Sequence, residues 1–131
     1  MKKLIYGISL LLALSACEVV VVEPYDPRER IIGDWEIEEY SQTFDEIYLF
    51  PITISRFGGD GESVRIHNFY DSNLSVRAYL VGNKIQIPFQ VVDFYEISGV
   101  GTIHGDEITF NYAVYDQIYG GLTDHCVATA W

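Results

Sequence analysis

Beyond its N-terminal part, the chain alternates between apolar and polar residues in short runs. In residues 31–41, for example, Trp35 and Ile37 alternate with Glu36 and Glu38. A period of two is typical of a β-strand that buries one face and exposes the other to solvent. The pattern therefore predicts a first strand in this segment.

Six further segments repeat the alternation, and turn residues such as Gly82-Asn83 separate them. A last extended segment covers 122–131, and its inward face is left open. The residues that we expect to face inward in the six segments are Tyr48, Phe50, Ile52 and Ile54; Val64 and Ile66; Leu74, Val76, Ala78 and Leu80; Ile85, Ile87, Phe89 and Val91; Tyr95, Ile97, Gly99, Gly101 and Ile103; and Ile108, Phe110, Tyr112 and Val114.

The chain is predicted to be all-β, because it shows neither a helical period of 3.6 nor internal repeats beyond its N-terminal segment. Eight strands with short connections pair as an antiparallel meander, which predicts an up-and-down barrel that closes on itself. A β-sandwich is the alternative. We expect large side chains to fill most of the interior, among them Trp35, Phe50, Phe89, Phe110 and Tyr112.

The first seventeen residues have the layout of an export signal. Two lysines precede an apolar run over residues 4–14, and small residues then lead to Cys17. The run is too short to span a bilayer as a helix. The sequence Leu-Ser-Ala-Cys at 14–17 resembles the lipobox of bacterial lipoproteins, and this resemblance implies cleavage before Cys17 and lipid on its thiol. The alternative is an ordinary secreted protein.

Three parts follow from these patterns. Residues 1–16 are the predicted signal peptide, 17–30 the lipidated Cys17 with a tether containing two prolines, and 31–131 the β-barrel domain. Outer-membrane attachment is favoured, because the residue after Cys17 is Glu18 and not the aspartate associated with inner-membrane retention. The side of the membrane that the domain faces is left open.

Charge narrows the choice of partners. Cleavage removes two lysines and leaves 6 basic against 19 acidic residues, a formal charge of −13. Such a surface repels nucleic acid and anionic lipid headgroups, so the lipid alone is expected to hold the protein to its membrane. The charge either keeps the domain soluble or attracts a basic protein.

The sequence predicts no catalytic residue, cofactor or metal site, because no nucleophile elbow, phosphate loop or zinc motif is present. We expect His67, His104 and His125 near strand ends or on outward faces. His125 and Cys126 point to opposite faces as strand neighbours, so they cannot easily share a metal. We expect Cys126 to be a buried thiol.

Four residues are candidate contacts for a ligand or partner. Glu39 shares the inward parity of Trp35, so its carboxylate either serves a function at the barrel mouth or marks the exposed end of the strand. Tyr79, Tyr115 and Tyr119 are expected on outward faces or loops, where tyrosine favours contact with proteins or glycans. Scattered exposed tyrosines are the ordinary alternative.

The sequence Ile-Gly-Asp-Trp-Glu at 32–36 resembles the Gly-x-Trp signature of the lipocalin and calycin barrels. The resemblance implies that Gly33 and Trp35 are structural and that Trp35 packs across the closed end of the barrel. Lipobox, tether and Gly-x-Trp together look like the small lipocalin-like lipoproteins of gut-type Bacteroidota.

These features predict a membrane-anchored binding module that is not an enzyme. Three roles remain open. The first is a carrier of a small apolar molecule or lipid, with a cavity of roughly 300 Å³ or more inside the barrel. The second is an inhibitor or interaction module for a cationic protein, with a filled barrel. The third is a structural subunit of an envelope complex, with an exposed apolar patch.

Overall fold

The computed structural model describes residues 25–131; the predicted signal peptide, Cys17 and most of the tether lie outside this range. The elements are a short 3-10 helix, η1 (Pro27–Arg30), and the strands β1 (Gly33–Ser41), β2 (Glu46–Arg56), β3 (Ser63–Phe69), β4 (Leu74–Val81), β5 (Lys84–Val92), β6 (Tyr95–His104), β7 (Glu107–Asp116) and β8 (Asp124–Ala130).

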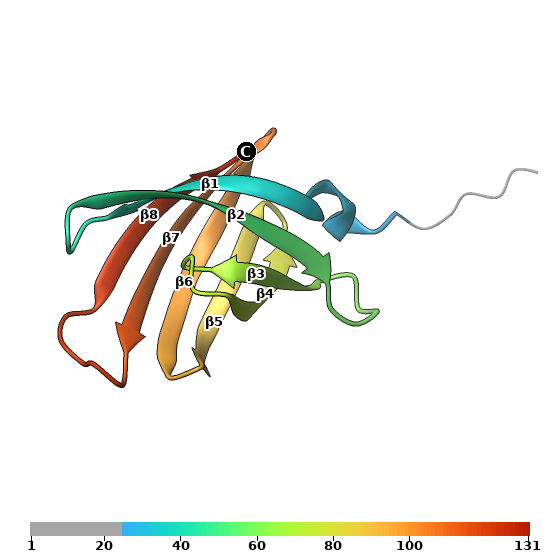
Figure 1. The fold of residues 1–131 in the computed structure, drawn as a ribbon. Helices are drawn as coiled ribbons and strands as arrows, with labels where there is room; N and C mark the ends of the chain where they lie inside the picture. Colours follow the sequence, from blue (N-terminus) through green and yellow to red (C-terminus); the bar gives the residue numbers. More distant parts are fainter. Residues whose placement is uncertain (1–24) are drawn as a thin grey trace, which may run out of the picture.

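The eight strands form a closed antiparallel barrel in chain order, which confirms the predicted up-and-down topology (Figure 1). Each strand pairs with its neighbour in sequence, and β1 closes the barrel by pairing with β8 from Ile37↔Ala130 to Ser41↔Cys126. Pairing is extensive between β6 and β7, but β4 and β5 pair only near the capped end, from Tyr79↔Gln86 to Val81↔Lys84.

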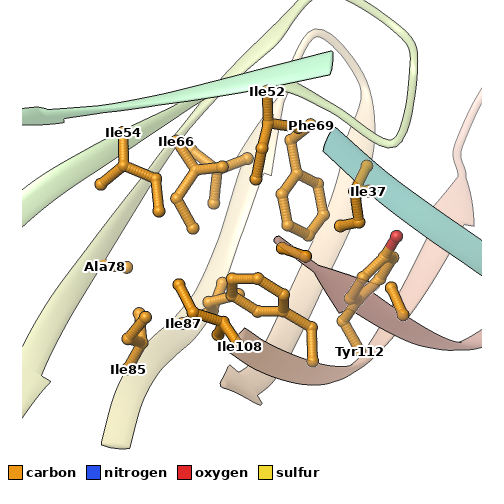
Figure 2. Close-up of a cluster of buried hydrophobic side chains, with 14 of the residues drawn as sticks. Ile37, Ile52, Ile54, Ile66, Phe69, Ala78, Ile85, Ile87, Ile108 and Tyr112 are labelled. Carbon is orange, nitrogen blue, oxygen red and sulfur yellow. The ribbon is translucent and has the colours of Figure 1, made fainter. Parts of the chain in front are cut away.

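The inward faces of the strands meet in one apolar core (Figure 2). Isoleucine dominates it, as at Ile54, Ile85 and Ile108, because a β-branched side chain packs well on a pleated surface. The largest fully buried side chain is Phe110, which lies in the barrel interior. Burial alternates with a period of two along most strands, as the sequence predicted.

Strand β5 departs from the prediction. The register against β6 shifts between Ile87 and Gln90, so the residues after the shift exchange faces. Phe89 is 67% exposed and Val91 is also exposed, whereas Gln90 is buried. The Gln90 amide is satisfied there, because it accepts a hydrogen bond from the Arg77 backbone N–H and donates one to the Arg77 carbonyl. The predicted inward placement of Phe89 and Val91 is therefore wrong.

The two inward glycines of β6 permit a close approach of β7. A Cβ on Gly99 would lie 2.5 Å from the Asn111 carbonyl oxygen and 2.5 Å from the Tyr112 Cβ. A Cβ on Gly101 would lie 2.8 Å from the ring of Phe110. The sequence suggested a bend or tight corner here, and the structure shows the reason for glycine: backbone and side-chain atoms of β7 occupy the space.

One end of the barrel is covered by η1, and we call it the capped end. It also carries the β2–β3 loop at 57–62, the turns at 82–83 and 105–106, and the C-terminal Trp131. In Figure 1, η1 lies at the right of the barrel, where the described chain begins. Because Ile31 is fully buried beneath it, the ordered fold starts before the predicted boundary at residue 31.

Arg28 holds the capped end together from inside. Its side chain is only 3% exposed, and its guanidinium donates to the carbonyl oxygens of Gly58 at 2.9 Å and Ser63 at 3.0 Å. The same group forms an ion pair with Asp26 at 2.9 Å. The hydrogen bonds from Arg28 to the Asp26 carboxylate hold the pKa of that carboxyl well below its usual range. The last residues of the predicted tether are thus an integral part of the domain.

Trp35 lies beside this cap. Its ring is half-buried against the core, and its indole Nε1 donates a hydrogen bond of 2.9 Å to the Ile31 carbonyl oxygen. Gly33 has a φ of 132°, a conformation that a side chain rarely adopts. Both residues therefore have structural roles at the entry to β1.

Candidate functional site

The opposite end of the barrel, which we call the open end, carries the connections at 42–45, 70–73, 93–94 and 117–123. The β1–β2 hairpin and the β7–β8 loop project at this end, at the left of Figure 1. Two carboxyl side chains lie inside it, and both are almost inaccessible to solvent: Glu39 is 2% and Asp124 is 4% exposed.

Strand parity explains how these two carboxyls come to face inward. Glu39 follows Ile37 on the buried face of β1, two residues nearer the open end. Asp124 begins β8 on the face shared by Cys126 and Ala128. Because Glu39 lies directly opposite Ala128 across the β1–β8 pair, a small side chain leaves room for the carboxyl group.

Hydroxyl groups satisfy both carboxyls. Tyr112 donates a hydrogen bond to Oε2 of Glu39, while Asp124 accepts one from Ser41 at 2.5 Å and another from Tyr70. Figure 2 shows Tyr112 at the edge of the apolar cluster, near Ile37 of β1. No cation takes part in these hydrogen bonds among residues 25–131.

Burial and negative charge shift the titration of this cluster. Burial raises the pKa of Glu39, and the nearby carboxylates of Asp124 and Asp71 raise it further. Burial, together with the neighbouring carboxylates, raises the pKa of Tyr112, of Tyr70 and of the Cys126 thiol. The cluster therefore disfavours further negative charge, and a positive charge placed here would relieve the repulsion.

A pocket of about 210 Å³ opens above these carboxyls. Its wall combines aromatic rings with acidic groups, and the side chains come from β1, β2, β8 and two turns. The lining residues are Glu39, Phe44, Glu46, Tyr48, Tyr70, Asp71 and Asp124.

A second pocket of about 240 Å³ adjoins the first, since Phe44, Tyr70 and Asp124 line both. The β7–β8 loop contributes the far wall through Tyr119 and Leu122. The open end thus offers two adjoining hollows that share aromatic and acidic lining residues.

Charge is unevenly distributed along the barrel. The six lysine and arginine residues of 25–131 all lie outside the connections and pocket walls of the open end. Acidic residues at those connections and walls are Glu39, Asp45, Glu46, Asp71, Asp93, Asp116 and Asp124. The open end is therefore a strongly negative surface without internal compensation by lysine or arginine.

Exposed apolar side chains also gather at the open end. They surround the pockets on three connections and on the first residues of β2, which is more than scattered surface residues would give. These side chains are Phe44, Ile47, Tyr48, Leu49, Phe94, Ile118, Tyr119 and Leu122.

The structure places the four predicted contact residues in separate locations. Glu39 lies inside the open end, Tyr119 is 88% exposed on its β7–β8 loop, and Tyr115 lies on the outer wall nearby. Tyr79 lies on the outer face of β4 near the capped end. Contact by the tyrosines stays a prediction. Cys126 is buried, as expected.

Tyr48, predicted to face inward, is exposed because β2 extends beyond the core at the open end; it lines the pocket there. His125 and His104 are exposed, and His67 lies on the outer face, where its Nε2 is 2.8 Å from the Ser55 hydroxyl. Within the described part of the chain, we find no group of three His, Cys, Asp or Glu side chains placed to hold a metal ion.

Sequence reasoning missed Asp124, Ser41 and Tyr70. Asp124 shares a parity with Cys126 and the alanines of β8, but small residues give a weak inward signal. Ser41 follows Glu39 by two positions and was equally open to detection. Tyr70 has a φ of 59° in a turn, so strand parity says nothing about its direction.

Comparison with known proteins identifies a lipid attachment site at the N-terminus. A family model described as a prokaryotic membrane lipoprotein lipid attachment site matches residues 1–17. The chain therefore carries the attachment site of a membrane-anchored lipoprotein of the cell envelope. No helix of residues 25–131 is long and apolar enough to cross a membrane.

No curated protein matches the chain in sequence. Among solved structures, a redesigned β-barrel is similar, with a TM-score of 0.56 and 8% sequence identity. The similarity covers 83% of this chain and 96% of the designed one. At this identity the likeness concerns the fold alone.

Proposed function

We propose that this chain is a membrane-anchored, non-catalytic binding module whose open end binds a basic protein or peptide. One observation carries the proposal: the pocket that combines Glu39 and Asp124 with aromatic walls lies at an end of the barrel where lysine and arginine are absent from the connections and pocket walls. A lysine or arginine side chain of the partner would supply the missing positive charge.

The pocket chemistry suits an organic cation. Carboxylates attract an ammonium or guanidinium group, and the faces of Phe44, Tyr48 and Tyr70 can add cation–π attraction. Partial burial strengthens both effects, because they act at a lower local dielectric than in water. The exposed apolar rim supplies the area that a protein interface needs in addition to charge.

The interior supports this role better than that of a carrier. The barrel centre is filled by side chains such as Phe110, Ile54 and Ile85. The two hollows above the core, about 210 and 240 Å³, lie at the mouth of the barrel and share the Asp124 wall, so neither is an apolar cavity in the barrel interior. A small apolar ligand would also meet carboxyl groups at the entrance, which disfavours it.

The anchor leaves the open end accessible. The chain enters the described domain at Tyr25, on the capped side, and only eight peptide steps separate that residue from Cys17. Eight steps reach at most roughly 30 Å. The membrane attachment is therefore joined to the barrel at the end opposite the pocket.

Two finer features belong to the same proposal. Outer-membrane attachment is supported by Glu18 after Cys17, and membrane fractionation with protease treatment of intact cells would test it. A lipocalin-like origin is supported by Gly33 and Trp35 at the capped end. A lipocalin-type role would then differ in using the mouth in place of the interior.

Binding of fluorescent hexa-arginine to the mature acylated protein in zwitterionic nanodiscs tests the proposal. The test variant is Glu46→Gln with Asp71→Asn, which removes two charges from the pocket wall. Asparagine tolerates the φ of 49° at position 71. We expect affinity to fall roughly 10-fold and to weaken with salt.

The matched control is Asp106→Asn with Glu107→Gln at the capped end, which changes net charge by the same amount. We expect its affinity to stay within about twofold of the unmodified protein, since charges farther than a Debye length are screened. Equal losses in the two double variants would show that only net charge matters, and the proposed site would be abandoned.

A further inference from the structure

Acidic residues are absent from three consecutive strands. The chain has 19 aspartates and glutamates, yet β3, β4 and β5 contain none, whereas every other strand contains at least one. The outer face of these strands, which we call the β3–β5 face, therefore differs from the rest of the domain.

Two arginines lie at the centre of the β3–β5 face. Arg65 of β3 is directly opposite Arg77 of β4 across the strand pair. Like charges in this arrangement repel each other, and neither arginine has a carboxylate within 4 Å among residues 25–131. Arg65 is held in place, because its guanidinium lies 4.4 Å from the centre of the Phe57 ring.

The positive charge continues toward the capped end. Within residues 25–131, the Lys84 ammonium at the start of β5 donates only to the Thr102 hydroxyl, at 3.0 Å. Arg30 of η1 donates to the turn between β4 and β5, through the Asn83 side chain and the Gly82 carbonyl. Four basic side chains thus follow one side of the barrel, without carboxylate partners within residues 25–131, up to the end where the tether begins.

Exposed apolar side chains accompany this charge. Tyr79 and Val81 are exposed near the capped end, and Phe89 and Val91 are exposed farther along β5, nearer the open end. The register shift in β5 is what turns Phe89 and Val91 outward. Acidic side chains border this surface at two places, since Glu96 of β6 is paired with Val91 and Glu62 of the β2–β3 loop lines a hollow with Arg30 and Val81. The strands themselves combine arginine and lysine with tyrosine, phenylalanine and valine, which is typical of contact with a membrane interface.

We propose that the β3–β5 face rests on the anionic headgroups of the membrane to which Cys17 anchors the chain. The arginine pair binds lipid phosphates, and the apolar side chains enter the headgroup layer. The tether permits this contact, because at most roughly 30 Å of chain joins Cys17 to the domain at the neighbouring capped end. The net negative charge of the chain does not reveal this basic surface, since the acidic groups lie on the other five strands and on the loops.

The tether favours lipid headgroups over a soluble anion as the ligand of the β3–β5 face. It confines the face near the bilayer, so even weak attraction to each headgroup is effective at high local concentration. The contact would leave the open end free at the side of the barrel, and it stands independently of the function proposed there.

The test uses the acylated protein on vesicles of phosphatidylcholine, with and without phosphatidylglycerol. An environment-sensitive dye is attached at Gln86→Cys on the β3–β5 face or at Asn111→Cys on the opposite wall; both positions are exposed. We expect a blue shift of the Gln86→Cys probe on anionic vesicles, lost at high salt, and none at Asn111→Cys.

Arg65→Gln with Arg77→Gln should lower the ratio of docked to undocked protein roughly 25-fold, at about fivefold per side chain. Arg77→Gln alone, whose side chain makes no hydrogen bond within residues 25–131, should give the fivefold step without affecting folding. The charge-matched control, Gln42→Glu with Gln117→Glu, should leave the probe signal unchanged. Equal responses of the two probes, or equal effects of the two double variants, would overturn the proposal.

Discussion

The two ends of this barrel differ in whether their buried charges have an ionic partner. At the capped end, Arg28 is buried with an ionic partner, Asp26, and with backbone carbonyls that accept its remaining hydrogens. At the open end, Glu39 and Asp124 are buried with neutral hydroxyl donors and no cation among residues 25–131.

This difference suits the capped end to stability and the open end to binding. A compensated buried charge closes the capped end, and removal of either partner breaks the hydrogen-bonded ion pair between Arg28 and Asp26. The open end retains negative charge that the fold does not neutralise, beside a pocket and an apolar rim. Uncompensated charge of this kind lowers stability and raises affinity for a cation, a trade-off common at binding sites.

The largest expected effect is at the capped end. Arg28→Met should remove the guanidinium donor of the Gly58 and Ser63 carbonyls and of the Asp26 carboxylate, which then keeps Arg56 and a backbone N–H as its donors. We expect the melting temperature to fall by roughly 10 °C or more, because removal of one partner from a buried charge is strongly destabilising. Thermal unfolding followed by circular dichroism measures it. Arg30→Met, whose guanidinium is exposed, is the control and should change little.

A smaller loss is expected at the open end when Asp124 loses a donor. Tyr70→Phe removes the half-buried hydroxyl that donates to its Oδ2. The free energy of unfolding should fall by about 1–2 kcal/mol. Denaturant titration of this variant beside Tyr40→Phe, which loses only an exposed hydrogen bond to Asp45, separates burial from simple loss of a hydroxyl. Equal losses would contradict the account.

Removal of the Glu39 charge should stabilise the protein, in contrast to the substitutions of Arg28 and Tyr70. Glu39→Gln keeps an acceptor for Tyr112 and removes a buried carboxylate, so unfolding free energy at neutral pH should rise by about 1 kcal/mol. Folding raises the pKa of Glu39 above its ordinary value of 4.5. The free-energy cost of burying the ionised carboxylate is therefore absent below that value and grows as pH rises through the folded-state pKa.

Denaturant titrations across this pH range check the reversal. The stabilising effect of Glu39→Gln should disappear on the acidic side of the window, where the carboxyl is protonated in both states. The same variant should bind hexa-arginine more weakly. A variant that is less stable than the unmodified protein at neutral pH would remove the contrast between the two ends.

The smallest effect is expected on the outer wall. Phe89→Ser should change stability by less than about 0.5 kcal/mol, because the ring is exposed after the register shift. Phe110→Ala, in the interior, should cost about 3–5 kcal/mol. Denaturant midpoints of the pair compare an outward with an inward phenylalanine. A large loss at Phe89 would place its ring in the core.

Strand alternation predicted most of the fold and one half of the site. Parity placed Glu39 on the inner face of β1, and the structure confirms that position. It failed at Phe89, because apolar residues occur in both parities of β5 and a register shift leaves no mark in such a run. Local pattern predicts faces, whereas register depends on the partner strand.

Other features needed long-range information. The role of Arg28 depends on carbonyl groups about thirty residues later in the chain, and its own segment contains prolines that resemble a linker. Asp124 was missed because its inward neighbours in β8 are Cys126, Ala128 and Ala130. Small side chains there are what make room for the carboxyl cluster.

The most direct test of the division between the ends is an NMR titration of the isotope-labelled mature protein with hexa-arginine. We expect shifts of backbone amide signals in 42–48, 70–73, 93–96 and 117–124, and unchanged signals in 28–31, 57–62 and 105–106. Shifts that concentrate at the capped end, or that spread evenly over the acidic surface, would contradict it.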